Sequence, residues 1–169
     1  MKITIIGSGN MGGAIAKGLS QGSIFQANDI TCTAQTDETL EKMRHINEAF
    51  NLTHDNINAV READIVVIAV KPWRVQSIIE EIRPALQFDK QIIVSIAAGV
   101  TFEQLNGFLT KTTTSKAHVN PVIFRVMPNT AIEVKSSMTF ISAYNASQEQ
   151  IDLLISIFNE LGNAILIEE

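Results

Sequence analysis

The first twenty residues constrain the fold more than any other stretch of the chain. Residues 3–6 are Ile-Thr-Ile-Ile, a short β-forming run with apolar residues on both faces, as a strand inside a parallel sheet requires. The motif Gly-x-Gly-x-x-Gly follows at residues 7–12, and Met11, Ile15 and Leu19 then recur at helical spacing. This stretch therefore predicts a buried strand, a glycine-rich turn and a helix, in that order.

Each glycine of the motif has a physical task. Gly7 permits the tight turn, Gly9 lets backbone approach a pyrophosphate, and Gly12 lets the helix pack closely on the strand. The positive end of that helix can hold phosphates, so the stretch predicts a dinucleotide-binding site. The alternative is a sharp turn with no ligand. We expect Gly9→Ala or Gly12→Val to abolish nucleotide binding and to leave the fold largely intact.

The rest of the chain alternates between strand and helix patterns. Further strands are expected at residues 30–34, 65–70, 91–96, 122–127, 138–141 and 164–167. Helices are expected at residues 39–50, 56–63, 72–86, 101–109 and 147–161, with a loop at 110–116 and Gly162 as the last helix terminator. The alternation predicts one α/β domain over residues 1–169, with a doubly wound, mainly parallel sheet in three α/β/α layers (a Rossmann fold). The direction of the late edge strands is left open.

Composition narrows the classes of partner. The chain has 169 residues, 46% of them hydrophobic, and a net charge of −5 without a basic stripe, so nucleic acid and anionic membranes are not expected as partners. The longest apolar run, residues 65–70, is too short to span a bilayer, and the early first strand leaves no room for a signal peptide. The single cysteine, Cys32, is expected to be a buried core residue in a reducing cytoplasm. His45, His54 and His118 are expected at the surface, and no metal-ligand cluster is apparent.

Four stretches together resemble pyrroline-5-carboxylate reductase, the last enzyme of proline biosynthesis. They are Gly-Ser-Gly-Asn-Met-Gly-Gly-Ala-Ile at 7–15, Ala-Val-Lys-Pro at 69–72, Val-Ser-Ile-Ala-Ala-Gly-Val-Thr at 94–101 and Arg-Val-Met-Pro-Asn-Thr at 125–130. The last two are more specific than the glycine motif, and the similarity covers essentially the whole chain. The resemblance implies hydride transfer from a reduced nicotinamide to the C=N carbon of 1-pyrroline-5-carboxylate, giving L-proline. A protonated imine is already electrophilic, so the protein's contribution is orientation and charge placement.

The resemblance also implies site residues. The pyrophosphate would lie on residues 7–12, and the adenine ribose beside Thr33, Gln35 and Thr36, with Asn56 near it. The nicotinamide would lie along 69–72 and 97–99, and residues 127–130 would close the pocket. The cofactor-binding set is Gly7, Ser8, Gly9, Asn10, Met11, Gly12, Thr33, Gln35, Thr36, Asn56, Ala69, Val70, Lys71, Pro72, Ala97, Ala98, Gly99, Met127, Pro128 and Asn129. The catalytic residues stay unknown, because the family's substrate loop is expected outside this chain.

Several of these residues also fit a plainer interpretation. Lys71 can be a solvated lysine at a helix start, and Asn129 a turn residue after a proline. Residues 97–99 can be small only because a helix packs closely there. Arg125 is flanked by apolar residues and needs a partner or a path to solvent. The sequence leaves these alternatives open.

Two departures from the family pattern stand out. The family commonly has proline after Pro-Asn-Thr, where this chain has Ala131, which should loosen the turn slightly. In the family a helical domain follows Glu169, with a Ser-Gly-Ser-Gly-Pro-Ala loop that binds the substrate and helices that form the dimer. We therefore expect the cofactor half of an enzyme whose full-length form is a homodimer or larger, this chain itself being monomeric or weakly associating.

The cofactor preference follows from the end of the second predicted strand. An NAD-specific site usually places a carboxylate there, roughly 20 residues past the glycine motif. Residues 31–36 carry none, and their hydroxyls and amide could donate to a 2′-phosphate. No arginine stands beside them, and Asp37 and Glu38 would repel that phosphate, so we expect a modest preference for NADP(H), with NAD(H) possible. The rival hypotheses are another small NADP-dependent oxidoreductase, such as one linked to a deazaflavin, and a non-catalytic NAD(P)-sensing module.

Overall fold

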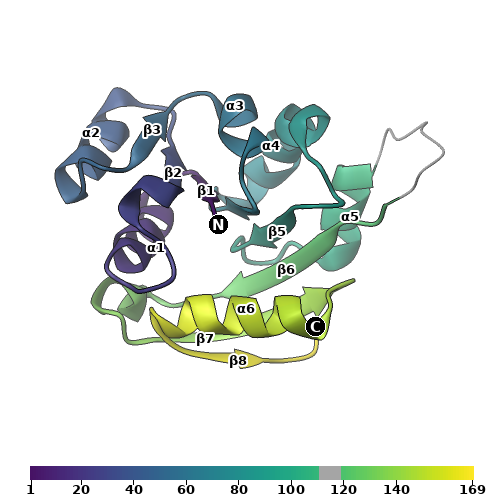
Figure 1. Ribbon diagram of the computed structural model, residues 1–169. Coiled ribbons are helices and arrows are strands. Elements are labelled where there is room, and N and C mark those ends of the chain that lie inside the picture. Colours follow the sequence, from purple (N-terminus) through teal and green to yellow (C-terminus); the bar gives the residue numbers. More distant parts are fainter. Residues whose placement is uncertain (111–118) are drawn as a thin grey trace.

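Eight strands form one sheet at the centre of the computed structural model, which describes residues 1–110 and 119–169 (Figure 1). In spatial order the strands are β3 (Asn51–Thr53), β2 (Ile30–Thr33), β1 (Ile3–Ile6), β4 (Ile65–Ile68), β5 (Ile92–Ser95), β6 (Val122–Met127), β7 (Ser137–Tyr144) and β8 (Gly162–Leu166). The strands from β3 to β6 are all parallel. Strand β7 runs antiparallel to β6, and β8 is parallel to β7, which settles the direction of the late strands.

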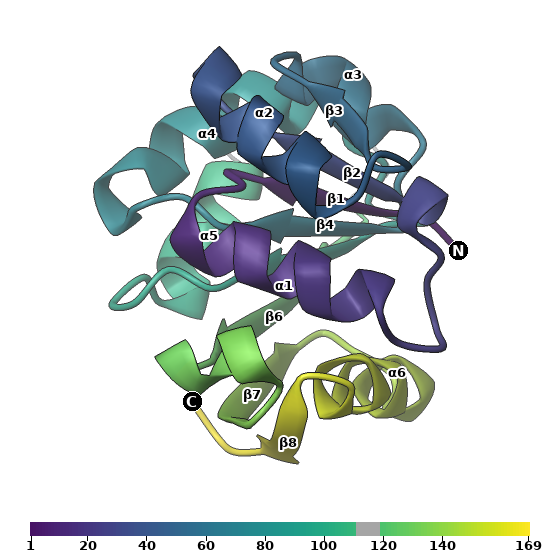
Figure 2. The same ribbon diagram turned by 90° about the vertical axis from the view of Figure 1, so that its left-hand side faces the viewer.

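The helices cover both faces of the sheet (Figure 2). Helices α1 (Asn10–Ser20), α2 (Asp37–Ile46) and α6 (Gln148–Asn159) pack on one face, and α3 (Asn56–Arg61), α4 (Val75–Ile82) and α5 (Phe102–Thr110) on the other. The central strand β4 serves both cores, because Val67 belongs to the first hydrophobic cluster and Val66 to the second. The predicted doubly wound, three-layer fold is confirmed.

Two predicted helix starts are confirmed by their hydrogen bonds. At α5 the backbone N–H of Gln104 donates to Thr101 Oγ1 over 3.2 Å, and the Gln104 side chain accepts from the Thr101 N–H over 3.0 Å. At α6 Ser147 and Gln150 form the same reciprocal pair, at 3.2 and 2.9 Å. Both helices therefore begin where the capping-box pattern indicates.

The second helix differs from its predicted range. It begins two residues earlier, at Asp37, because Thr36 caps it by accepting from the Thr39 N–H. It ends at Ile46, and the short polar strand β3 follows at the sheet edge, where no strand was predicted. Phe50 is still buried, as its place in the predicted apolar stripe required, but it lies in the turn before β3.

Other boundaries also move by a few residues. Strand β4 ends at Ile68, so residues 69 and 70 leave the sheet. Two 3₁₀ turns, at Pro72–Arg74 and Arg83–Ala85, bracket α4, which places Leu86 beyond the helix. A further 3₁₀ turn, η4 (Thr130–Val134), follows β6. Thr110 ends α5, and the rest of the predicted 110–116 loop lies outside the described residues, as does His118.

Gly162 has a different role from the predicted one. It does not terminate α6, whose C-cap is Glu160, but begins strand β8 with a φ of +139°. A Cβ built there would lie 2.1 Å from the Ser137 carbonyl oxygen, on the neighbouring strand. Only glycine permits both this backbone conformation and this close approach.

We expect Gly162→Ala to lower the free energy of unfolding by roughly 2 kcal/mol or more, because the new methyl is strained and collides with backbone. The matched control is Gly107→Ala inside α5, where nothing lies within 4 Å of the new Cβ. That change should raise the free energy by about 0.5–1 kcal/mol, the usual gain of alanine over glycine in a helix. Urea unfolding measures both, and equal effects of the two changes would contradict this account.

Candidate functional site

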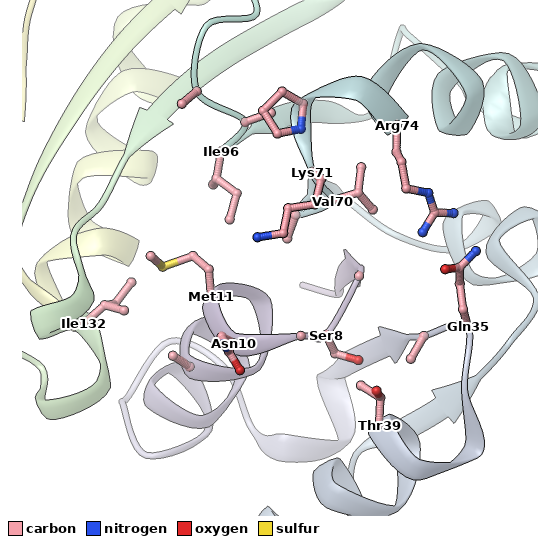
Figure 3. A pocket seen from close by; sticks show the side chains of 18 of the residues that line it. Ser8, Asn10, Met11, Gln35, Thr39, Val70, Lys71, Arg74, Ile96 and Ile132 are labelled. Atoms are coloured by element: carbon pink, nitrogen blue, oxygen red, sulfur yellow. The ribbon is translucent and has the colours of Figure 1, made fainter.

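A cleft of 710 Å³ opens at the carboxyl ends of the parallel strands (Figure 3). Its walls come from the segments that follow β1, β2, β4 and β5, together with η4 after β6. The lining residues are Gly7, Ser8, Gly9, Asn10, Met11, Ala14, Ala34, Gln35, Thr36, Thr39, Ala69, Val70, Lys71, Pro72, Arg74, Ile96, Ala97, Ala98, Thr130, Ile132 and Glu133. Open α/β sheets bind ligands at this edge, so the cleft is the candidate site.

The glycine-rich turn is tied to the neighbouring strand β2. The backbone N–H groups of Gly7 and Ser8 donate to the Thr33 carbonyl over 3.2 and 2.9 Å, and Ser8 Oγ donates to the same oxygen over 2.8 Å. Thr33 is itself buried and does not line the cleft. Its carbonyl holds the turn in place, and the Ser8 hydroxyl is committed to that contact.

The start of α1 faces the cleft without a cap of its own. The N-cap is Gly9, no side chain caps the helix, and no acidic residue lies in its first turn. A Cβ built on Gly9 would meet nothing within 4 Å, so open space lies over the backbone there. The free N–H groups and the positive helix end therefore suit an anion such as a pyrophosphate.

Gly12 is packed in the opposite way. A Cβ there would lie 2.1 Å from the Gly7 carbonyl oxygen and 3.0 Å from Ala69 Cβ. This confirms the close helix-to-strand contact predicted from the motif. It also means that the expectation of an intact fold in Gly12→Val is wrong, because the added side chain collides with the backbone of the turn.

The opposite wall continues from β4 and β5. The N–H groups of Ala69 and Ile96 donate to the carbonyls of the adjacent strands, at Ile6 and Ile68, over 2.8 and 3.2 Å. These bonds hold residues 69–72 and 96–98 against the cleft. Lys71, Arg74 and Glu133 are the charged residues of the lining.

Sequence reasoning missed Arg74. It lies in the 3₁₀ turn after β4, and its guanidinium faces the Gln35 side chain across one end of the cleft (Figure 3). The sequence separates these residues by 39 positions, but β2 and β4 both flank β1, so the segments after them share one opening. Searching the turns after both flanking strands, and not only the end of β2, would have found this arginine. The other unpredicted lining residues are Ala14, Ala34, Thr39, Ile96, Ile132 and Glu133.

Some predicted site residues lie away from the cleft lining. These are Gly12, Thr33, Asn56, Gly99, Met127, Pro128 and Asn129. The Asn56 amide instead lies 3.2 Å from a Glu81 carboxylate oxygen. Asn129 caps η4 by accepting from the Ala131 N–H over 3.1 Å, a bond that the family's proline could not make. Asn129 therefore acts as a turn residue here, and Thr130 is the member of that motif that reaches the cleft.

Arg125 finds its partner within the chain. It pairs with the Glu169 carboxylate and lies over the Phe102 ring, 5.7 Å from the ring centroid. The same carboxylate accepts from the Phe102 N–H at the start of α5. Arg125 therefore ties the last residue to β6 and α5 and is not among the residues lining the cleft.

Cys32 and the two described histidines, His45 and His54, do not line the cleft. Cys32 is buried in β2, and burial raises the pKa of its thiol to about 12, so it stays protonated and inert. His45 and His54 lie at the surface, as predicted. Within residues 1–110 and 119–169 no group of His, Cys, Asp and Glu could hold a metal ion, and no helix has the length and apolar character needed to cross a membrane.

The cleft can now be set beside known proteins. Residues 2–99 match the family model described as "NADP oxidoreductase coenzyme F420-dependent". Pyrroline-5-carboxylate reductase 2 of Dictyostelium discoideum is 33% identical over 182 aligned residues, which cover 99% of this chain and 58% of that protein. The solved pyrroline-5-carboxylate reductase of Coxiella burnetii is similar with a TM-score of 0.86 at 30% identity, covering 99% of this chain and 59% of the other.

A third similarity concerns the fold. Plasmodium falciparum pyrroline carboxylate reductase, solved with NADP bound, gives a TM-score of 0.84 at 24% identity and covers 100% of this chain and 58% of that one. The chain thus spans just under three fifths of the length of each of these three proteins. The resemblance first seen in four motifs is confirmed along the whole chain.

Substitutions at Gly9 and Gly12 should lower the free energy of unfolding by different amounts. Gly12→Ala should lower the free energy of unfolding by roughly 3 kcal/mol, the upper end of the cost of overpacking, because the new methyl meets a backbone carbonyl. Gly9→Ala should lower it by no more than about 1 kcal/mol, the cost of alanine at an N-cap. Urea unfolding of both variants tests this, and a Gly12→Ala protein as stable as the wild type would contradict the close packing.

Proposed function

The chain belongs to the family described as NADP oxidoreductase, coenzyme F420-dependent, and we propose that within it the chain is the cofactor-binding part of a pyrroline-5-carboxylate reductase. One observation carries the choice of reaction. Similarity to pyrroline-5-carboxylate reductases extends over 99% of the chain, whereas the family model covers residues 2–99. The cofactor is NADP(H), with NAD(H) as the weaker ligand.

The residues of the cleft fit such a cofactor from end to end. The open backbone of Gly9 at the start of α1 would hold the pyrophosphate, and Gln35 and Thr36 would hold the adenine ribose. Met11 and the turns at 69–72 and 96–98 would hold the nicotinamide. Thr130 and its neighbours in η4 close that end of the cleft.

Bound NADPH would supply a hydride to the C=N carbon of protonated 1-pyrroline-5-carboxylate; the nitrogen would keep its proton and take up the electron pair of the double bond, giving L-proline and NADP⁺. The chain's own residues hold and orient the ring and exclude water from one of its faces. Ile96, Ala97 and Ile132 provide apolar surface for this purpose. No nucleophile is required of the protein, which agrees with the inert, buried thiol of Cys32.

We propose that residues 1–169 form one dinucleotide-binding domain and that a helical part, corresponding to the remaining length of the relatives, holds the imine and joins subunits. The proposal includes a cytoplasmic location, which the single cysteine, Cys32, supports because it forms no disulfide. Nucleic acid and membranes are not among the partners.

A second candidate is hydride exchange with a deazaflavin, which the description of the family model favours. The glycine-rich turn and the cleft would serve that reaction equally well. This second candidate does not explain why residues 100–169 are similar to pyrroline-5-carboxylate reductases. We therefore rank it below the first.

We expect the 169-residue chain to bind NADPH but to reduce 1-pyrroline-5-carboxylate poorly, because positioning of the substrate supplies about 7–11 kcal/mol of a lowered barrier. A form extended by the sequence its gene encodes beyond Glu169 should turn over. The rate of NADPH oxidation in the presence of 1-pyrroline-5-carboxylate compares the 169-residue chain with the extended form. The Coxiella burnetii enzyme is the positive control. The Gly9→Ala variant, which keeps the fold and should lose NADPH binding, is the negative control.

Each outcome discriminates. Equal turnover by both forms would place the substrate site within residues 1–169. Turnover with oxidised coenzyme F420 and not with the imine would favour the second candidate. Binding of NADPH without any turnover by the extended form would favour a sensing module.

We also propose that the chain associates with a second copy of itself through a row of exposed apolar residues across β6, β7 and β8. Met127, Phe140 and Ile165 are register neighbours on β6, β7 and β8 and are 37%, 38% and 45% exposed. Helix α6 packs on the other face of these strands, through residues such as Ile141. A contiguous apolar patch of this kind marks an interaction surface.

We therefore expect weak, concentration-dependent self-association of the 169-residue chain in sedimentation velocity. Phe140→Ser should reduce it, since it removes the middle of the row. Val134→Ser is the matched control, because Val134 is exposed by 73% but lies in η4, outside the row. An ideal monomer at all concentrations, or equal effects of both changes, would contradict the proposal.

A further inference from the structure

One end of the cleft carries a cation opposite a group of polar side chains. Arg74 reaches over the opening from the turn after β4, and Gln35, Thr36 and Thr39 line the side after β2 (Figure 3). The hydroxyl groups of Thr36 and Thr39 form a hydrogen bond, with 3.0 Å between their Oγ1 atoms. A guanidinium that faces an amide, with a hydroxyl pair on the same wall as that amide, offers the kinds of donor from which a phosphate group accepts hydrogen bonds.

The guanidinium of Arg74 is available for a ligand. Its backbone is fixed, since its N–H donates to the Lys71 carbonyl over 2.9 Å and its own carbonyl accepts from Ser77 Oγ over 2.9 Å. None of the ion pairs formed by the described residues includes its side chain. The fold therefore holds the base of this arginine while its charged end stays free.

The acidic residues nearby are paired elsewhere. Asp37 and Glu38 open α2 directly after Thr36, yet neither lines the cleft. Asp37 Oδ1 lies 2.6 Å from His54 Nε2, and Glu38 lies 3.1 Å from the Lys42 ammonium. The repulsion expected from the sequence is thus offset by a partner for each carboxylate.

His54 reinforces this balance by its geometry. Its Nδ1 lies 2.7 Å from the Ala34 carbonyl oxygen, while its Nε2 faces Asp37. Both partners are acceptors, so this arrangement favours the protonated ring, whose two N–H groups can donate to both. The pKa of His54 is raised accordingly, first by the Ala34 carbonyl and then by Asp37.

We infer that Arg74, with Gln35 and the Thr36–Thr39 hydroxyl pair opposite it, forms a site for the 2′-phosphate of NADP(H), and that Arg74 sets the preference for NADP(H) over NAD(H). The inference rests on the proposed function, because it assumes that the adenine ribose lies beside Gln35. It adds the residue that discriminates between the two nucleotides. A carboxylate in this place would instead bind the 2′-hydroxyl of NAD(H).

The test is calorimetric titration of NADPH and NADH, and of the fragments adenosine 2′,5′-bisphosphate and 5′-AMP, which differ only in the 2′-phosphate. Arg74→Gln should weaken NADPH and the bisphosphate roughly tenfold to hundredfold, as loss of a charge-assisted hydrogen bond predicts, and leave NADH and AMP within about twofold. Arg74→Lys should fall between, because it keeps the charge but not the planar fork. Arg61→Gln in α3, an exposed arginine outside the cleft lining, is the matched control and should change nothing.

The outcomes separate this inference from the function on which it rests. If the wild type binds neither NADPH nor NADH, the proposed function fails and the inference with it. If the wild type binds both nucleotides equally, or if Arg74→Gln weakens NADPH and NADH alike, the inference is overturned while nucleotide binding stands. Thermal unfolding of each variant verifies that the fold is retained.

Discussion

The site depends on the close approach between the first turn of α1 and the end of β1. Because Gly12 has no side chain, the first turn of α1 can pack directly against the Gly7 carbonyl, and the helix lies close to the strand. This close packing points the uncapped start of α1 toward the cleft at the carboxyl ends of the strands. Three hydrogen bonds from Gly7 and Ser8 to one carbonyl, that of Thr33, then fix the turn against β2. A single packing constraint thus places the positive helix end where an anion can bind.

Strand order converts this local feature into a cleft. Because β2 and β4 lie on either side of β1, the chain segments that leave them face each other across the glycine-rich turn. Residues far apart in the sequence, such as Gln35 and Arg74, therefore face one another at one end of the opening (Figure 3). Apolar residues, among them Ile96 and Ile132, line the cleft toward its other end. The cleft is polar where a phosphorylated ribose would lie and more apolar where a nicotinamide ring would.

Much of the fold can be predicted from the periodicity of apolar residues and from the residues that cap helices and form turns. Continuous apolar runs such as 65–68 identify the buried parallel strands, and capping pairs such as Ser147 and Gln150 identify helix starts. Strand β3 was not predicted because its three residues, one leucine between two polar residues, show no pattern that distinguishes them from a loop. Gly162 was misassigned because a φ of +139° is imposed by the contact with Ser137, which is not local in sequence. Arg74 was missed for the same reason, since its neighbourhood exists only once the strands are ordered.

The central claim is that the cleft above β1 holds a nicotinamide dinucleotide. The most direct measurement is a crystal structure of this chain grown with NADPH. The account predicts the pyrophosphate within hydrogen-bond reach of the backbone N–H groups at the start of α1, the adenosine beside Gln35, and the nicotinamide between Met11 and residues 96–98. A nucleotide bound elsewhere on the molecule, or a cleft left empty at saturating NADPH, would contradict it.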